Sequence, residues 1–146
     1  MKAADVQSTL RTAIAAIPAL SGVTVLIEDG AADNDGPALD QLNTHKGVAI
    51  IVQRIARMDA ETQDRPAHAR VIVPVTLQEK VERNRGEDGT GKTALELCDA
   101  MIGAVLNFRD AGPPAFSLAP TPIVNLGAEK GLEEYVITFR ARVTYV

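Results

Sequence analysis

The alternation of apolar and polar side chains near the C-terminus is the sequence feature that most constrains the fold. Apolar or aromatic residues occupy every second position, and most positions between them are charged or hydroxyl-bearing: Tyr135, Ile137, Phe139, Ala141, Val143 and Tyr145 alternate with Glu134, Thr138, Arg140, Arg142 and Thr144. A period of two is the pattern of a strand that buries one face and exposes the other. The fold therefore contains a sheet with one face against a core.

Earlier segments also have the patterns of strands. These are Val23–Ile27, Val48–Met58 and Ala67–Gln78, with Ile123–Leu126 as a shorter one. The second begins with a continuous apolar run and continues into Arg54 and Arg57, which predicts one long strand whose far end emerges into water. The third contains Pro74, which has no N–H to donate, so the strand must lie at an edge there or carry a bulge.

Two segments have apolar residues at helical spacing, Asp5–Ile17 and Thr93–Phe108, with Asp5 as the expected N-cap of the first. Between the elements, Glu28–Asp40 has five acids, no basic residue and several turn formers, so we expect a solvated acidic loop. The prolines of Asp110–Pro122 predict an extended connection without regular structure.

The order of these elements indicates the fold class. Strands follow one another after the first helix, which favours antiparallel pairing over alternating strand and helix units. We therefore predict a single α+β domain over residues 1–146, with a mostly antiparallel sheet of four to five strands and two helices packed on one face.

Composition and charge narrow the classes of function. Apolar residues make up 46% of the 146 residues and charged residues 23%, as in compact globular domains. The formal net charge of −4 repels a phosphate backbone, so we expect no direct nucleic-acid readout. No apolar run is long enough to span a membrane and the N-terminus does not have the order of a signal peptide, so we expect no membrane partner.

The residues that usually carry metal or covalent chemistry are few. Cys98 is the only cysteine and His45 and His68 are the only histidines, so neither a disulfide framework nor a Cys/His zinc cluster is expected. The run Asp33-Asn34-Asp35-Gly36 is similar to the start of a calcium loop but lacks the further ligands and the closing glutamate, which favours a solvated turn. Cys98 lies on an apolar helix face, as a buried, inert thiol does. We expect no catalytic residue, metal or cofactor.

One string matches a nucleotide-binding motif. Residues 86–93 read Gly-Glu-Asp-Gly-Thr-Gly-Lys-Thr, which satisfies the pattern of a phosphate-binding loop through Gly86, Gly91, Lys92 and Thr93. Such a loop must spring directly from a buried parallel strand, whereas Gly86 follows the charged run at residues 82–85. A magnesium-binding acid at the end of a neighbouring strand is also missing. Thr93 and Glu96 instead form a capping box ahead of an apolar helix, so we interpret the string as structural.

The layout of the chain resembles that of the tail terminator and tail-completion proteins of tailed bacteriophages. The resemblance rests on the leading helix, the strand ending in Val71-Ile-Val-Pro-Val-Thr-Leu77, the glycine-bearing loop, the helix over residues 94–106 and the C-terminal strand over residues 135–145. It covers about residues 5–146 and includes no short invariant motif.

The resemblance implies a structural virion protein, assembled in the host cytoplasm, without catalytic residues. Its α+β subunits would form a ring, usually of six copies, that caps the tail tube, ends tube polymerisation and presents the surface that joins the head. The implied partners are further copies of the chain, the tail tube protein and a head-completion or neck protein. Two alternatives stay open: a head-to-tail connector, and a small nucleotide-binding domain built on the string at residues 86–93.

Charge asymmetry suggests where copies of the chain meet. Glu28–Asp40 is acidic, whereas Arg54, Arg57, Arg65 and Arg70 gather on the next two strands and their connector. Unlike patches that meet across a head-to-tail interface can close a ring. We therefore predict a subunit interface that contains Asp33, Asp35, Arg54 and Arg57.

Overall fold

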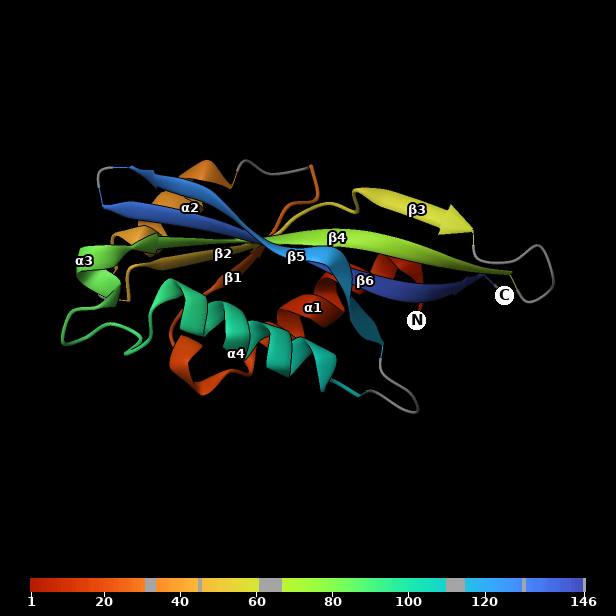
Figure 1. The fold of residues 1–146 in the computed structure, drawn as a ribbon, viewed down its shortest axis with the longest axis horizontal. Helices are drawn as coiled ribbons and strands as arrows, with labels where there is room; N and C mark the ends of the chain where they lie inside the picture. The colour runs from red at the N-terminus through yellow and green to blue at the C-terminus, as the bar shows by residue number, and fades with distance from the viewer. Residues whose placement is uncertain (31–33, 45, 61–66, 110–114, 130, 146) are drawn as a thin grey trace.

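The computed structural model describes residues 1–30, 34–44, 46–60, 67–109, 115–129 and 131–145. In chain order the elements are η1 (Ala3–Asp5), α1 (Val6–Ala15), η2 (Pro18–Leu20), β1 (Val25–Ile27), α2 (Asp35–Leu42), β2 (Val48–Val52), β3 (Arg57–Ala60), β4 (Ala67–Lys80), α3 (Val81–Asn84), α4 (Ala94–Leu106), β5 (Phe116–Glu129) and β6 (Leu132–Tyr145) (Figure 1).

A single sheet organises the described residues. Its strand order is β1-β2-β4-β6-β5, and β3 pairs with the part of β4 that β2 does not reach. Only β1 and β2 run parallel, and every other pair is antiparallel. The α+β class and the mostly antiparallel sheet are thus confirmed. The sheet is mixed and has six strands in the described part of the chain, instead of the four to five expected.

Helices lie on both faces of the sheet, whereas two helices on one face were expected. Figure 1 shows α1 and α4 together below the sheet and α2 above it. On the upper face Ala38 and Leu42 of α2 pack with Ala49 and Ile51 of β2. The continuous apolar run of β2 is explained by this arrangement, because all five of its residues are buried and the two faces meet different helices.

The prediction of a solvated loop over Glu28–Asp40 is therefore wrong in part, because α2 begins at Asp35. Gly36 and Pro37 are two of the turn formers in this segment, and both lie in the first turn of α2. The N–H groups of a first helical turn have no partner within the helix, so a proline there removes no hydrogen bond.

The long strand expected over Val48–Met58 is divided into β2 and β3. The break lies opposite Pro74, whose carbonyl accepts from Gln53 N at 2.9 Å. In an antiparallel ladder the N–H and C=O of one residue point to the same neighbour, so the missing N–H of Pro74 faces this break. β4 is central and regularly paired with β6, and the irregularity predicted from Pro74 lies in the neighbouring strand.

β5 corrects the expectation of an irregular connection up to Pro122 and a short strand after it. Of the segment before this strand, residues 110–114 lie outside the described residues. β5 extends from Phe116 to Glu129 and includes Pro120. Prolines are tolerated because β5 is an edge strand, and its register shifts between Leu118 and Ile123 and again between Asn125 and Gly127.

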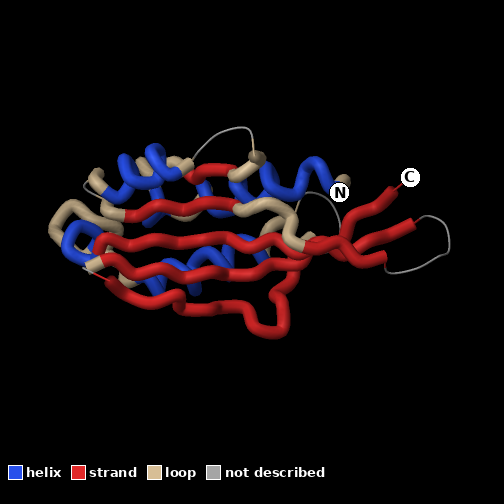
Figure 2. The backbone as a smooth tube through the Cα atoms, turned by 90° about the horizontal axis from the view of Figure 1, so that it is seen from above, coloured by secondary structure: helices blue, strands red, loops and turns tan. Residues whose placement is uncertain are grey.

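The core lies between the lower helices and the sheet. Leu97, Met101 and Val105 of α4 and Ile137, Phe139 and Val143 of β6 are all at most 1% exposed and belong to one cluster. The second long helix therefore packs on the last strand. Both termini lie at one end of the molecule, where Thr144 N donates to Met1 O at 3.1 Å (Figure 2).

Candidate functional site

The string at residues 86–93 lies in the loop between α3 and α4. The element before α3 is β4, which is antiparallel to all three strands that pair with it, so no parallel strand leads into the loop. Gly86, Gly91 and Lys92 are exposed. This loop therefore lacks the parallel strand that holds a phosphate-binding loop against a helix N-terminus.

The predicted capping box is present at the start of α4. Thr93 Oγ1 accepts from Glu96 N at 3.3 Å, and Glu96 Oε1 accepts from Thr93 N at 3.2 Å. The hydrogen bonds from the backbone and hydroxyl of Thr93 lower the pKa of the Glu96 carboxyl. An ionised side chain of the protein itself thus occupies the end of the helix that would otherwise face an anion.

The loop is anchored by a buried polar cluster that the sequence reading missed. Glu79 and Asn84 are 0% exposed. Asn84 Nδ2 donates to Glu79 Oε2 and, at 2.8 Å, to the carbonyl oxygen of Lys92, while Asn84 Oδ1 accepts from the amide and hydroxyl of Thr90. Arg85 Nη2 donates to Glu79 Oε1 at 3.0 Å. The signal was Glu79 itself, a carboxylate at a core-facing position of β4.

Close backbone approach explains one glycine of the string. A Cβ built on Gly89 would lie 1.8 Å from the carbonyl oxygen of Asn84. Lys46 Nζ donates to the carbonyl oxygen of Gly89 at 3.4 Å and ties the loop to the chain before β2. The glycine therefore serves to close the loop against α3.

The two arginines of the predicted interface have partners within one chain. Arg54 Nη2 lies 3.5 Å from Glu28 Oε1, and Arg57 Nε lies 2.8 Å from an oxygen of Asp59. Asp35 is exposed at the start of α2, and Asp33 lies outside the described residues. Both arginines are more than half exposed, so these ion pairs stabilise the subunit little and leave the side chains accessible. The interface itself stays a prediction.

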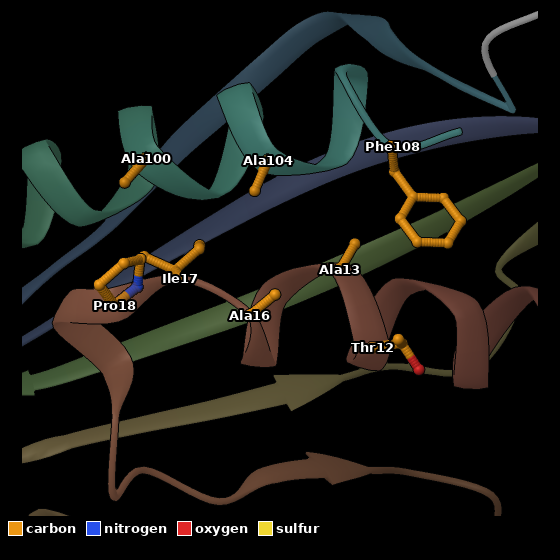
Figure 3. A pocket seen from close by; sticks show the side chains of 8 residues that line it. All are labelled: Thr12, Ala13, Ala16, Ile17, Pro18, Ala100, Ala104 and Phe108. Carbon is orange, nitrogen blue, oxygen red and sulfur yellow. The ribbon is translucent and has the colours of Figure 1, made fainter. Parts of the chain in front are cut away.

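An apolar groove lies between α1 and α4. It has a volume of about 420 Å³ and is lined by Thr12, Ala13, Ala16, Ile17, Pro18, Ala100, Ala104 and Phe108 (Figure 3). The alanines of the two helices face each other across it, and Phe108 closes one end. Among the described residues that line the groove, only Thr12 has a polar side chain.

The thiol and the described histidine are in structural positions. Cys98 is 0% exposed, and burial raises the pKa of its thiol to about 12, so the reactive thiolate does not form at neutral pH. His68 Nδ1 lies 3.2 Å from Thr144 Oγ1 across the β4–β6 ladder. His45 lies outside the described residues. In the described ranges no three His, Cys, Asp or Glu side chains gather closely enough to hold a metal ion.

Apolar side chains are exposed on the β5–β6 hairpin, and we call Val124, Leu126 and Leu132 the hairpin patch. Their exposed fractions are 41%, 59% and 42%. A partner that covered these side chains would remove their apolar surface from water. The strand order places β5 at the edge of the sheet, so the patch adjoins an open backbone edge among the described residues.

Comparison with known proteins adds no family assignment. No protein-family model matches the chain, and no curated protein matches its sequence. Among the described helices, none combines the length and the apolar character needed to cross a membrane.

Proposed function

We propose that the chain is a structural virion subunit, a tail terminator that assembles into a ring on the finished tail tube, ends tube polymerisation and provides the surface that joins the head. Its partners would be further copies of itself, the tail tube protein and a head-completion or neck protein. The proposal combines the layout resemblance with the surfaces that the structure exposes.

The observation that carries the proposal is the open edge at β5 beside the hairpin patch. Backbone N–H and C=O groups of an edge strand can pair with another chain, and exposed apolar side chains add affinity. The register shifts and Pro120 interrupt the edge at its middle, which limits indiscriminate pairing. Between the two register shifts, the backbone near Val124 pairs regularly with β6, and its outer edge can pair with a specific partner.

The opposite edge of the sheet is closed by polar side chains. Asn34 Nδ2 donates to the carbonyl oxygen of Ile27 at 3.0 Å, and Gln41 Oε1 accepts from Thr24 N at 3.2 Å. β1 is only three residues long. The two edges therefore differ in their capacity to pair, which favours contacts between unlike surfaces over a symmetric edge-to-edge dimer.

The experiment is a capping assay with tail tubes from the same particle. Tail tube protein is polymerised with and without the purified chain, and tube lengths and ends are scored by negative-stain microscopy. We expect shorter tubes with added density at one end. Binding to portal complexes instead of tube ends would support the connector alternative.

The surface is tested with a matched pair of variants. Leu126→Lys places a charge in the hairpin patch and should reduce capping. Leu95→Lys makes the same change on α4, where Leu95 is 51% exposed, and should cap as the wild type does. Equal capping by both variants would show that the hairpin patch does not contact the tube.

A further inference from the structure

The described residues cover the upper face of the sheet only in part. α2 packs on β2 through Ala38 and Leu42, whereas Arg70, Arg142 and Ser117 on the same face of β4, β6 and β5 are exposed. The lower face has α1 and α4, so the described helices cover the two faces unequally.

Arginines gather on this uncovered face. Strand register places four of them on the α2 side of the sheet: Arg57 on β3, Arg70 on β4, and Arg140 and Arg142 on β6. Asp59 stands opposite Arg70, and Ile72 stands between Arg57 and Arg140 across the three strands. We call this surface the arginine face. Its charge is opposite in sign to the net charge of the chain.

Arg140 is the member of this surface without a counter-ion. Its Nε is buried and makes no hydrogen bond, and no ion pair joins its guanidinium to any residue in the described ranges. Its cross-strand neighbours are Ile72 and Ser117, which carry no charge. A half-buried guanidinium without a carboxylate is costly, and an acidic group brought to this face would remove that cost.

The outward surface of α2 has the complementary chemistry. Ala38 and Leu42 point to β2, so helical spacing directs Asp40 away from the sheet and leaves Leu39 on the flank of the helix. Leu39 is 58% exposed, and Asp40 is exposed and has no ion-pair partner among the described residues. Asp35, one turn earlier, is exposed as well. An apolar side chain flanked by carboxylates fits a face in which Ile72 and Pro74 lie beside arginines.

We infer that the arginine face is the docking site for α2 of a second copy of this chain, with Asp40 meeting Arg140 and Leu39 packing near Ile72. The α2 helix of the same subunit is held on β2 and does not cover this surface. The donor and acceptor surfaces differ, so repeating the contact head to tail builds a ring when the rotation closes. This inference rests on the proposed function and names the ring contact that it requires.

Charge complementarity also indicates why the second copy is preferred over another acidic partner. The segment 28–40 is the longest acidic stretch in the chain. Because each copy carries both this segment and the arginine face, the two surfaces are present in equal amounts. Opposite charges steer the encounter and set its register, while Leu39 supplies apolar contact. An eight-residue helix is a small contact, so closure of a ring or a tube end would be needed to make it stable.

Site-directed cross-linking tests the contact directly. Leu39→Cys and Ser117→Cys are made in separate chains, mixed and oxidised; both positions are exposed, and Cys98 is buried and does not compete. We expect a disulfide-linked heterodimer that forms faster than with Glu82→Cys in place of Leu39→Cys. Adding Arg140→Gln to the Ser117→Cys chain should slow cross-linking about tenfold, and salt near 1 M should do the same.

The outcomes separate the inference from the proposed function. Cross-linking no faster than that of the Glu82→Cys control, or insensitive to Arg140→Gln and to salt, would overturn the α2 contact. A chain that carries both cysteines should give a ladder beyond the dimer, and a product that stops at the dimer would overturn the head-to-tail arrangement. Tail tubes capped by a chain that fails these tests would leave the proposed function standing with a different interface.

Discussion

At the residue scale, the polar groups that resemble a ligand site form hydrogen bonds with one another. Thr93 and Glu96 cap α4, and the buried pair of Glu79 and Asn84 holds the preceding loop. Hydroxyl, amide and glycine residues in such a loop match a phosphate-binding string because both structures need small residues and exposed backbone amides. Context, above all the strand that precedes the loop, distinguishes them.

The cap gives the first prediction. Thr93→Ala removes the oxygen that accepts from Glu96 N and should lower the free energy of unfolding by about 0.5–2 kcal/mol. Lys92→Ala is the matched control and should be close to neutral, since Lys92 is exposed. Urea unfolding followed by circular dichroism measures both. A larger loss for Lys92→Ala than for Thr93→Ala would contradict this view of the loop.

The buried thiol gives the second prediction. The pKa of Cys98 is raised to about 12 in the folded chain from its ordinary value of 9.0, so the unfolded state releases its proton first. Stability is unaffected below the unfolded pKa and should fall as pH rises above 9. At pH 8 a thiol reagent should modify Cys98 only as fast as the chain unfolds. Rapid modification of the native protein would show that the thiol is accessible.

At the element scale, the sequence predicted the elements that bury one face and expose the other. It did not predict the limits of β2, which is buried on both faces, or of β5, which contains prolines at the edge of the sheet. β6 and α4 have a single clear period, so their limits and their mutual packing were predictable. β2 is buried on both faces, so its continuous apolar run does not indicate which helix covers which face. β5 contains prolines that would disrupt a central strand, and only its position at the edge, a property of the whole sheet, permits them.

The packing of α4 on β6 gives the third prediction. Phe139 is 1% exposed in the core, so Phe139→Ala should cost about 3–5 kcal/mol of unfolding free energy. Ser117→Ala on the neighbouring strand is exposed and should change stability by less than about 0.5 kcal/mol. Thermal unfolding measures both variants. A smaller loss of stability for Phe139→Ala than for Ser117→Ala would show that the buried face of β6 is wrongly assigned.

At the scale of the whole molecule, the surfaces matter more than any cluster of reactive groups. The hairpin patch and the edge of β5 lie on one side of the strand order, and α2 and the capped edge of β1 lie on the other. Sequence alone suggested an acidic and a basic surface, but it could not show that Arg54 pairs with Glu28 of the same chain. It also could not place Arg140 on an uncovered face, because that depends on which face each helix covers.

The central claim is that copies of the chain form a closed ring at the end of a tail tube. The most direct measurement is the number of copies at a capped tube end, obtained from the mass of the end complex and from the rotational symmetry of its averaged images. We predict one fixed copy number, with six as the expected value, and tubes that no longer elongate. A single copy at each end, or a variable number on tubes that continue to grow, would contradict the claim.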